Sequence, residues 1–114
     1  MRRELRLRRR KDFDNVFRKG RSWNNELLVL RSLPNDLPHN RFGFITSKRL
    51  GKAVVRNRTR RRIREAVRVL SLTTSWDVVV SAKSKAAAAD FQQLRSAVMD
   101  LLTRAGLLSN EEDT

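Results

Sequence analysis

Residues 56–68 read RNRTRRRIREAVR, and this stretch predicts the element around which the rest of the chain is arranged. Seven of its thirteen residues are arginine and none is lysine. On a helix, at about 100° per residue, the apolar side chains form one stripe and the arginines gather opposite it. The stripe contains Val55, Thr59, Ile63, Ala66, Val67 and Leu70, and the opposite side contains Asn57, Arg61, Arg64 and Arg68. We therefore expect an amphipathic helix with one buried face and one cationic face.

The arginine density of this helix predicts a surface that binds a polyanion. Glu65 is the only acid between Arg41 and Arg68, so the cations repel one another in the free protein. Arginine pairs with phosphate through a planar fork and stacks on bases, which lysine does less well. An ordinary solvated helix face usually carries both signs of charge, so that alternative is disfavoured.

The composition restricts the class of protein. The chain has 114 residues, 39% of them apolar, which suits one domain with a single core. Its 26 basic against 12 acidic residues give a net charge of +14, concentrated in residues 1–21 and 41–68. Nucleic acid is the partner that this charge favours, with an anionic membrane as the weaker alternative. Without cysteine, signal peptide or an apolar run of membrane-spanning length, the chain is expected to be soluble and cytoplasmic.

Patterning along the chain predicts an α+β domain. The expected elements are a helix at Lys11–Lys19, strands at Arg21–Leu33 and Arg41–Ser47, the arginine helix, a strand at Asp77–Ser81 and a helix at Asp90–Ala105. Arg41–Ser47 is expected to pair with the preceding strand as a hairpin, and a further short strand is allowed near Lys48. Three consecutive valines predict that the strand at Asp77–Ser81 is buried on both faces, and Asp90 is the expected N-cap of the last helix.

Helices packed on one face of a small, largely antiparallel sheet would make a two-layer fold. We expect a basic N-terminal arm at residues 1–10, a single α-β domain at 11–106 and an acidic flexible tail at 107–114.

Phe13 and Phe17 allow two interpretations. Their spacing with Val16 suits plain core packing of a short helix, whereas aromatics among basic residues also serve as platforms that stack bases of single strands. Catalytic groups are not evident: the one histidine, His39, lies in a loop, and Asp12 and Asp14 point in different directions on a helix. No catalytic residue and no metal ligand is predicted, and a protein nuclease is therefore disfavoured.

Three stretches resemble the bacterial ribonuclease P protein family. The run Lys48–Arg58, KRLGKAVVRNR, continues as RRRIR at residues 60–64 and resembles the family's RNR signature. LRRRKDFDNVFRKGR at residues 7–21 and GFITSKRLG at residues 43–51 look like its other signatures. The resemblance implies an α-β sandwich of α-β-β-(β)-α-β-α order with a left-handed β-α-β crossover. It also implies assembly with a catalytic RNA that removes the 5′ leader of precursor tRNA, using magnesium held mainly by that RNA.

The resemblance assigns expected roles to two groups of residues. Contacts to the RNA subunit fall to Arg56, Asn57, Arg58, Arg60, Arg61, Arg64 and Arg68. The single-stranded leader cleft would be formed by Phe13, Phe17, Arg31, Ser47, Lys48 and Lys52. No membrane and no protein partner is expected, and the alternative function is a general RNA-binding or ribosomal protein without such a cleft.

The sequence departs from the family pattern at two positions. Thr59 stands on the buried stripe where the signature usually has an aliphatic residue, and its hydroxyl needs a partner. Arg31 stands where the first strand often has an aromatic, which favours contact with phosphate rather than stacking at that point.

Overall fold

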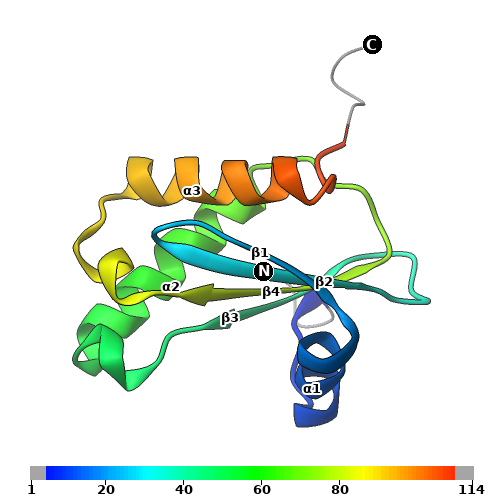
Figure 1. Ribbon diagram of the computed structural model, residues 1–114, viewed down its shortest axis with the longest axis horizontal. Coiled ribbons are helices and arrows are strands. Elements are labelled where there is room, and N and C mark those ends of the chain that lie inside the picture. Colours follow the sequence, from blue (N-terminus) through cyan, green and yellow to red (C-terminus); the bar gives the residue numbers. More distant parts are fainter. Residues whose placement is uncertain (1–4, 110–114) are drawn as a thin grey trace.

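The computed structural model of the chain describes residues 5–109 (Figure 1). The elements in chain order are α1 (Arg10–Lys19), β1 (Arg21–Asn24), β2 (Leu28–Pro34), β3 (Arg41–Ile45), a 3₁₀ turn (Lys48–Leu50), α2 (Ala53–Arg68), β4 (Trp76–Ala82), a second 3₁₀ turn (Ser84–Ala88) and α3 (Phe91–Arg104). The fold is therefore α+β, as predicted. Within residues 5–109, no helix is long and apolar enough to cross a membrane.

The four strands form one sheet of order β1-β2-β4-β3. β1 and β2 are antiparallel, as are β2 and β4, whereas β3 runs parallel to β4. Val78, Val79 and Val80 of β4 are all buried, which confirms the prediction of a strand covered on both faces. The parallel pair is joined through α2, so the fold contains the expected β-α-β crossover, whose hand stays a prediction.

The predicted hairpin between the first strand and Arg41–Ser47 is wrong. β4 lies between β2 and β3, so β3 pairs with β4 instead. β2 and β3 still run in opposite directions, and the loop of residues 35–40 only has to span the width of one inserted strand, about 10 Å. A short loop between antiparallel strands therefore resembled a hairpin in the sequence.

The predicted single strand Arg21–Leu33 is also wrong, because it consists of two strands. Asn25 breaks it: its side-chain oxygen accepts hydrogen bonds from the backbone N–H groups of Leu27 and Leu28, at 3.1 and 2.9 Å. Such an Asx turn reverses the chain and makes β1 and β2 a tight hairpin. This split supplies the additional strand of the sheet, whereas the segment near Lys48, where a further strand was allowed, forms a 3₁₀ turn.

Helices cover both faces of the sheet, so the expectation that all of them pack on one face is wrong for α1. Alternate residues of a strand point to opposite faces. Val78 and Val80 belong to the larger core beneath α2 and α3, whereas Val79 packs with Leu7 and Val16 beneath α1. In Figure 1, α2 and α3 lie on one side of the sheet and α1 lies on the opposite side.

The ends of the predicted central domain extend further than expected. Leu7, in the predicted arm, is buried and its N–H donates to the carbonyl of Phe42 at 2.8 Å. Leu107, in the predicted tail, is buried as well, and its carbonyl accepts from the N–H of Thr73. The remaining parts of arm and tail, residues 1–4 and 110–114, lie outside the described residues.

Candidate nucleic-acid interface

The arginine helix α2 has the predicted phase. Its buried residues are Thr59, Ile63, Ala66 and Val67. The residues expected to contact RNA lie away from that stripe: Asn57, Arg61 and Arg68 are exposed, and Arg56, Arg58, Arg60 and Arg64 are half-buried. One side of α2 therefore presents guanidinium groups along the whole helix.

These arginines fall into two groups according to what holds them. Arg60 donates to Thr46 Oγ1 at 2.7 Å and Arg62 donates to the carbonyl of Ala89 at 3.1 Å, so both are fixed against neighbouring segments. Arg61 and Arg64, in contrast, make no hydrogen bond or ion pair with any residue between 5 and 109. Unpaired guanidinium groups next to fixed ones suit an anionic partner, because its phosphates would relieve their mutual repulsion.

On the other face of the sheet, α1 holds its two phenylalanines differently. The ring of Phe13 lies on Gly43 of β3, and a Cβ atom added to Gly43 would stand 2.4 Å from Phe13 Cε1. Phe17 is 43% exposed, and the guanidinium of Arg31 lies 4.6 Å from the centre of its ring. The core interpretation therefore describes Phe13 best, whereas Phe17 leaves much of its ring open to solvent.

Beside α1, one row of the sheet remains open. Strand pairing aligns Val29, Ser81 and Ile45 across β2, β4 and β3, on the same face as α1. All three are half-buried, although β2 and β4 are interior strands. In the neighbouring row Val79 is fully buried against Val16 of α1, whereas Ile45 packs against the same cluster and stays partly exposed, so the cover that the helix provides decreases from one row to the next.

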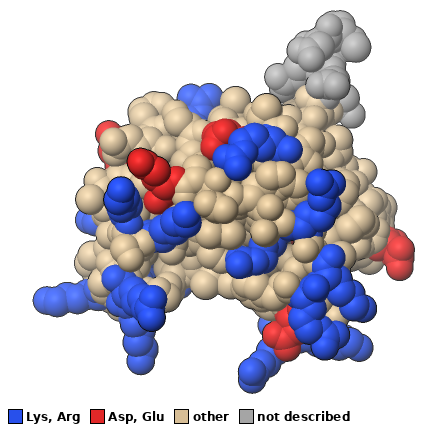
Figure 2. All heavy atoms as spheres, viewed as in Figure 1, with Lys and Arg blue, Asp and Glu red and all other residues tan. Residues whose placement is uncertain are grey.

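The basic turn lies across this open row from α1. Ser47, Lys48 and Lys52 are all exposed, between the end of β3 and the start of α2. Figure 2 shows Lys and Arg gathered on two projections, one over α1 and one over the start of α2, with a concave outline between them. A shallow, apolar-floored concavity with cationic walls on both sides suits a single-stranded polyanion.

Comparisons with known proteins identify the family. A family model described as Ribonuclease P matches residues 1–106. The chain belongs to the ribonuclease P protein family. It is 47% identical to the ribonuclease P protein component of Roseiflexus sp. (strain RS-1), over 95% of this chain and 91% of that one. It is 36% identical to the corresponding protein of Dehalococcoides mccartyi (strain CBDB1), over 99% and 94%.

Solved structures of ribonuclease P proteins share the fold. A Staphylococcus aureus RNase P protein mutant with defective mRNA degradation activity superposes with a TM-score of 0.87 at 30% identity, covering 92% of this chain and 91% of that one. The RNase P protein from Thermotoga maritima gives 0.77 at 33% identity, covering 87% and 96%. Family membership assigns the chain the role of a ribonuclease P protein component in tRNA processing, within an endoribonuclease complex.

A small hollow joins the two predicted groups of site residues. Its volume is about 170 Å³, and its lining includes Phe13 from α1 together with Arg60 and Arg64 from α2. Arg31 and Phe17 lie together on the α1 face, while Ser47, Lys48 and Lys52 lie on the opposite wall of the concavity.

Sequence reasoning missed the ion network that fixes α1. Arg41 of β3 donates to both carboxylate oxygens of Asp77, at 2.9 and 2.7 Å, and its third nitrogen lies 3.4 Å from Asp12 of α1. Asp77 is buried, and its hydrogen bond with Arg41 is the main cause of the raised pKa of Arg41. Because Asp12 precedes Phe13, this network positions the aromatic part of α1 on the sheet.

Sequence reasoning also missed Val29, Ile45 and Ser81 as the floor of the concavity. The alternation of strand residues could have placed them on one face, but only with the strand order known. The described residues contain no group of three His, Cys, Asp or Glu side chains that could hold a metal ion, and the expectation that magnesium is bound mainly by the RNA stays a prediction.

Proposed function

We propose that this chain is the protein subunit of a ribonuclease P ribonucleoprotein that endonucleolytically removes the 5′ leader of precursor tRNA. In this proposal the arginine face of α2 binds the catalytic RNA, the concavity beside α1 holds the single-stranded leader, and the RNA performs the hydrolysis.

The pairing state of the α2 arginines supports binding of the RNA subunit. Arg61 and Arg64 have no partner among residues 5–109, and the single acid of α2, Glu65, is bound to Arg68 at 2.9 Å. A folded RNA would supply phosphates to this face, and each contact would release counterions. Asn57, Arg56 and Arg58 extend the same surface toward the start of the helix.

The observation that carries the leader proposal is the half-exposed row Val29–Ser81–Ile45 between Phe17 and the basic turn. Bases of a single strand stack on exposed aromatic rings, and neighbouring cations follow the backbone. On one wall of the concavity, Phe17 would supply the aromatic ring and Arg31 a cation. On the opposite wall, Lys48 and Lys52 would supply further positive charge.

Catalysis is proposed to belong to the RNA, with magnesium bound mainly by it. The carboxylates Asp12 and Asp77 serve the ion network with Arg41 and are therefore not free to coordinate an ion. Magnesium bound by the RNA would supply an activated water and stabilise the leaving oxygen. The protein's own contribution is to bind and position the substrate, and its predicted location is the cytoplasm.

The test is cleavage of precursor tRNA by a bacterial ribonuclease P RNA at low magnesium, with and without this protein. We expect strong stimulation that Phe17→Ala lowers about tenfold on a long-leader substrate, since the stacking of one base on an aromatic ring has that magnitude. Phe91→Ala is the matched control, because Phe91 is also exposed, at 36%, but lies at the start of α3.

Two results would contradict the proposal. Absence of stimulation with RNA binding intact would leave a general RNA-binding or ribosomal protein. Equal effects of Phe17→Ala on substrates with a long leader and with a leader of a single nucleotide would remove the leader site while leaving the subunit role.

A further inference from the structure

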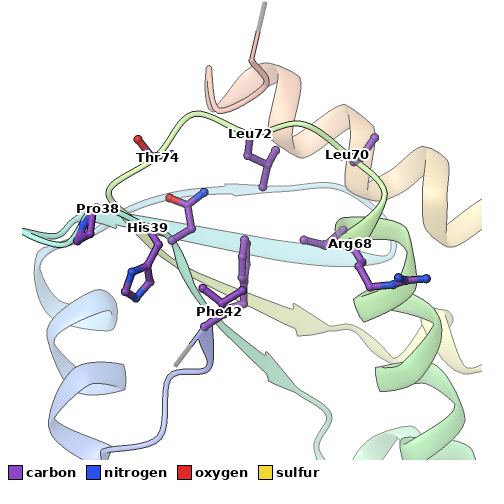
Figure 3. A pocket seen from close by; sticks show the side chains of 10 residues that line it. Pro38, His39, Phe42, Arg68, Leu70, Leu72 and Thr74 are labelled. Atoms are coloured by element: carbon purple, nitrogen blue, oxygen red, sulfur yellow. The ribbon is translucent and has the colours of Figure 1, made fainter. Parts of the chain in front are cut away.

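One pocket among residues 5–109 lies away from the leader concavity. It has a volume of about 560 Å³ and sits where the loop before β3, the end of α2 and the loop before β4 meet. In Figure 3, Leu72 points toward the ring of Phe42, with His39 on one side and Arg68 on the opposite side. Pockets of this size with an apolar interior and a few polar groups are typical ligand sites.

The pocket is held open by hydrogen bonds between its two loops. The side chain of Asn40 donates to the carbonyl of Thr73 at 2.7 Å and accepts from the N–H of Trp76 at 2.9 Å. Ser75 Oγ donates to the carbonyl of Leu37 at 2.6 Å, and Ser75 has the left-handed φ of 73° that non-glycine residues rarely adopt. Both loops are therefore fixed before any ligand arrives, which lowers the entropy lost on binding.

The chemistry of the lining favours a nucleobase. The interior is formed by Phe42, Val67 and Leu72, the rim carries His39, Arg68 and Thr74, and none of the lining residues within 5–109 is acidic. Unstacked bases of RNA are held between apolar or aromatic surfaces, imidazole rings and guanidinium planes. An acidic peptide would find too few positive charges in this lining, and a cation would meet positive rather than negative side chains.

The position of Arg68 connects this pocket with the arginine face of α2. Arg68 follows Arg61 and Arg64 on that face and is its last member before the helix ends. Its side chain is 59% exposed and its partner Glu65 is 46% exposed, so this ion pair is weak and Arg68 can exchange Glu65 for phosphate. An RNA strand following α2 would reach the pocket at this point.

We propose that the pocket between Phe42, Leu72 and His39 binds one unstacked nucleobase of the RNA that lies along α2, with Arg68 contacting the adjoining phosphate. This site rests on the proposed function, because it requires an RNA on α2. It adds a base-reading contact to a face that otherwise contacts backbone, and so would contribute to the choice of RNA.

The experiment places a photoreactive benzophenone side chain at Thr74, which is exposed at the pocket rim. The probe is a bacterial ribonuclease P RNA, and a second protein with the same group at Arg61 reports binding along α2. We expect the Thr74 probe to crosslink to one nucleotide, and removal of that base alone to weaken binding of the unmodified protein about tenfold.

The variant Thr74→Trp fills the pocket mouth and should weaken RNA binding by a similar factor. This variant should then bind the intact RNA and the RNA lacking the base with the same affinity. Ser96→Trp, on the exposed surface of α3, is the matched control and should bind like the parent protein. Because base removal is measured on the unmodified protein, the result does not depend on how the variant folds.

Three outcomes would overturn the proposal. Crosslinks from position 61 without any from position 74 would remove the pocket and leave the RNA-subunit role. Full affinity of the protein for the RNA lacking the base would also remove the pocket as a base site. Crosslinks from position 74 to a second copy of the chain would likewise remove it. No crosslinks from either position would contradict the proposed function itself.

Discussion

The ring of Phe13 occupies the space that a side chain on Gly43 would need. A Cβ atom at Gly43 would stand 2.4 Å from Phe13 Cε1 and 2.7 Å from Cζ, closer than non-bonded carbon atoms approach one another. This contact sets the distance between α1 and β3, and with it one wall of the leader concavity.

Gly43→Ala should therefore displace Phe13 and destabilise the protein by about 1–3 kcal/mol, the usual cost of overpacking. Urea unfolding measures this change. Phe13→Leu in the same chain should recover part of the stability, because the smaller side chain vacates the space. Additive destabilisation in the double variant would mean that the two residues do not compete for space.

The buried ion pair of Arg41 and Asp77 should be far more important for stability than the contact with Asp12. Asp77→Ala leaves Arg41 with only the longer bond, and removal of one partner of a buried pair costs about 3–5 kcal/mol. Asp12→Ala removes a half-buried carboxylate and should cost clearly less. Thermal unfolding of both variants decides the order, and equal destabilisation would show that the network acts as one unit.

The pH dependence of this network follows from the raised pKa of Arg41. A cation whose pKa is higher in the folded state adds stability that is complete below its ordinary pKa and disappears only above it. Arg41 therefore stays charged throughout the neutral range. We expect Arg41→Lys, which keeps the charge but lacks the fork, to destabilise the protein equally at pH 6 and pH 8. A difference between the two pH values would mean that another titrating group controls the network.

The N-terminus of α3 gives a prediction that concerns stability alone. Asp90 accepts from the N–H of Gln93 at 2.8 Å, and the side chain of Gln93 accepts from the N–H of Asp90 at 2.9 Å. Asp90→Ala removes this capping box and should cost about 1 kcal/mol in urea unfolding. RNA binding should not change, because this capping box involves none of the residues assigned to RNA contact; weaker RNA binding by the folded variant would extend the interface to the start of α3.

Replacing Arg61 and Arg64 by alanine should weaken RNA binding without lowering the melting temperature. Neither side chain has a protein partner among the described residues, and their removal relieves repulsion. The slope of log affinity against log salt should become shallower by about one for each phosphate that the protein no longer neutralises. Arg95→Ala, on the exposed side of α3, is the control and should leave the slope unchanged. A large drop in melting temperature would show that the two arginines support the fold.

The helices were largely predictable, because their signals are local. The four-residue recurrence of apolar side chains predicted which side of α2 is buried, and Thr59 lies on that side with 1% of its surface exposed. The capping of α3 by Asp90 could likewise be predicted from neighbouring residues. The turn at Asn25 is also local, but the run of apolar residues on both sides of it favoured one long strand.

What the sequence determined by itself was the cationic face, the central valine strand and the resemblance in residues 48–64 that pointed to the family. The tertiary structure alone decided the rest: β4 between β2 and β3, α1 on the opposite face from α2 and α3, and the row Val29–Ser81–Ile45 left open beside it. These features depend on pairing between residues far apart in the chain, such as Val29 with Ser81. Periodicity indicates which face of an element is apolar, but not which element covers that face. The covering element depends on how all elements pack together in the core.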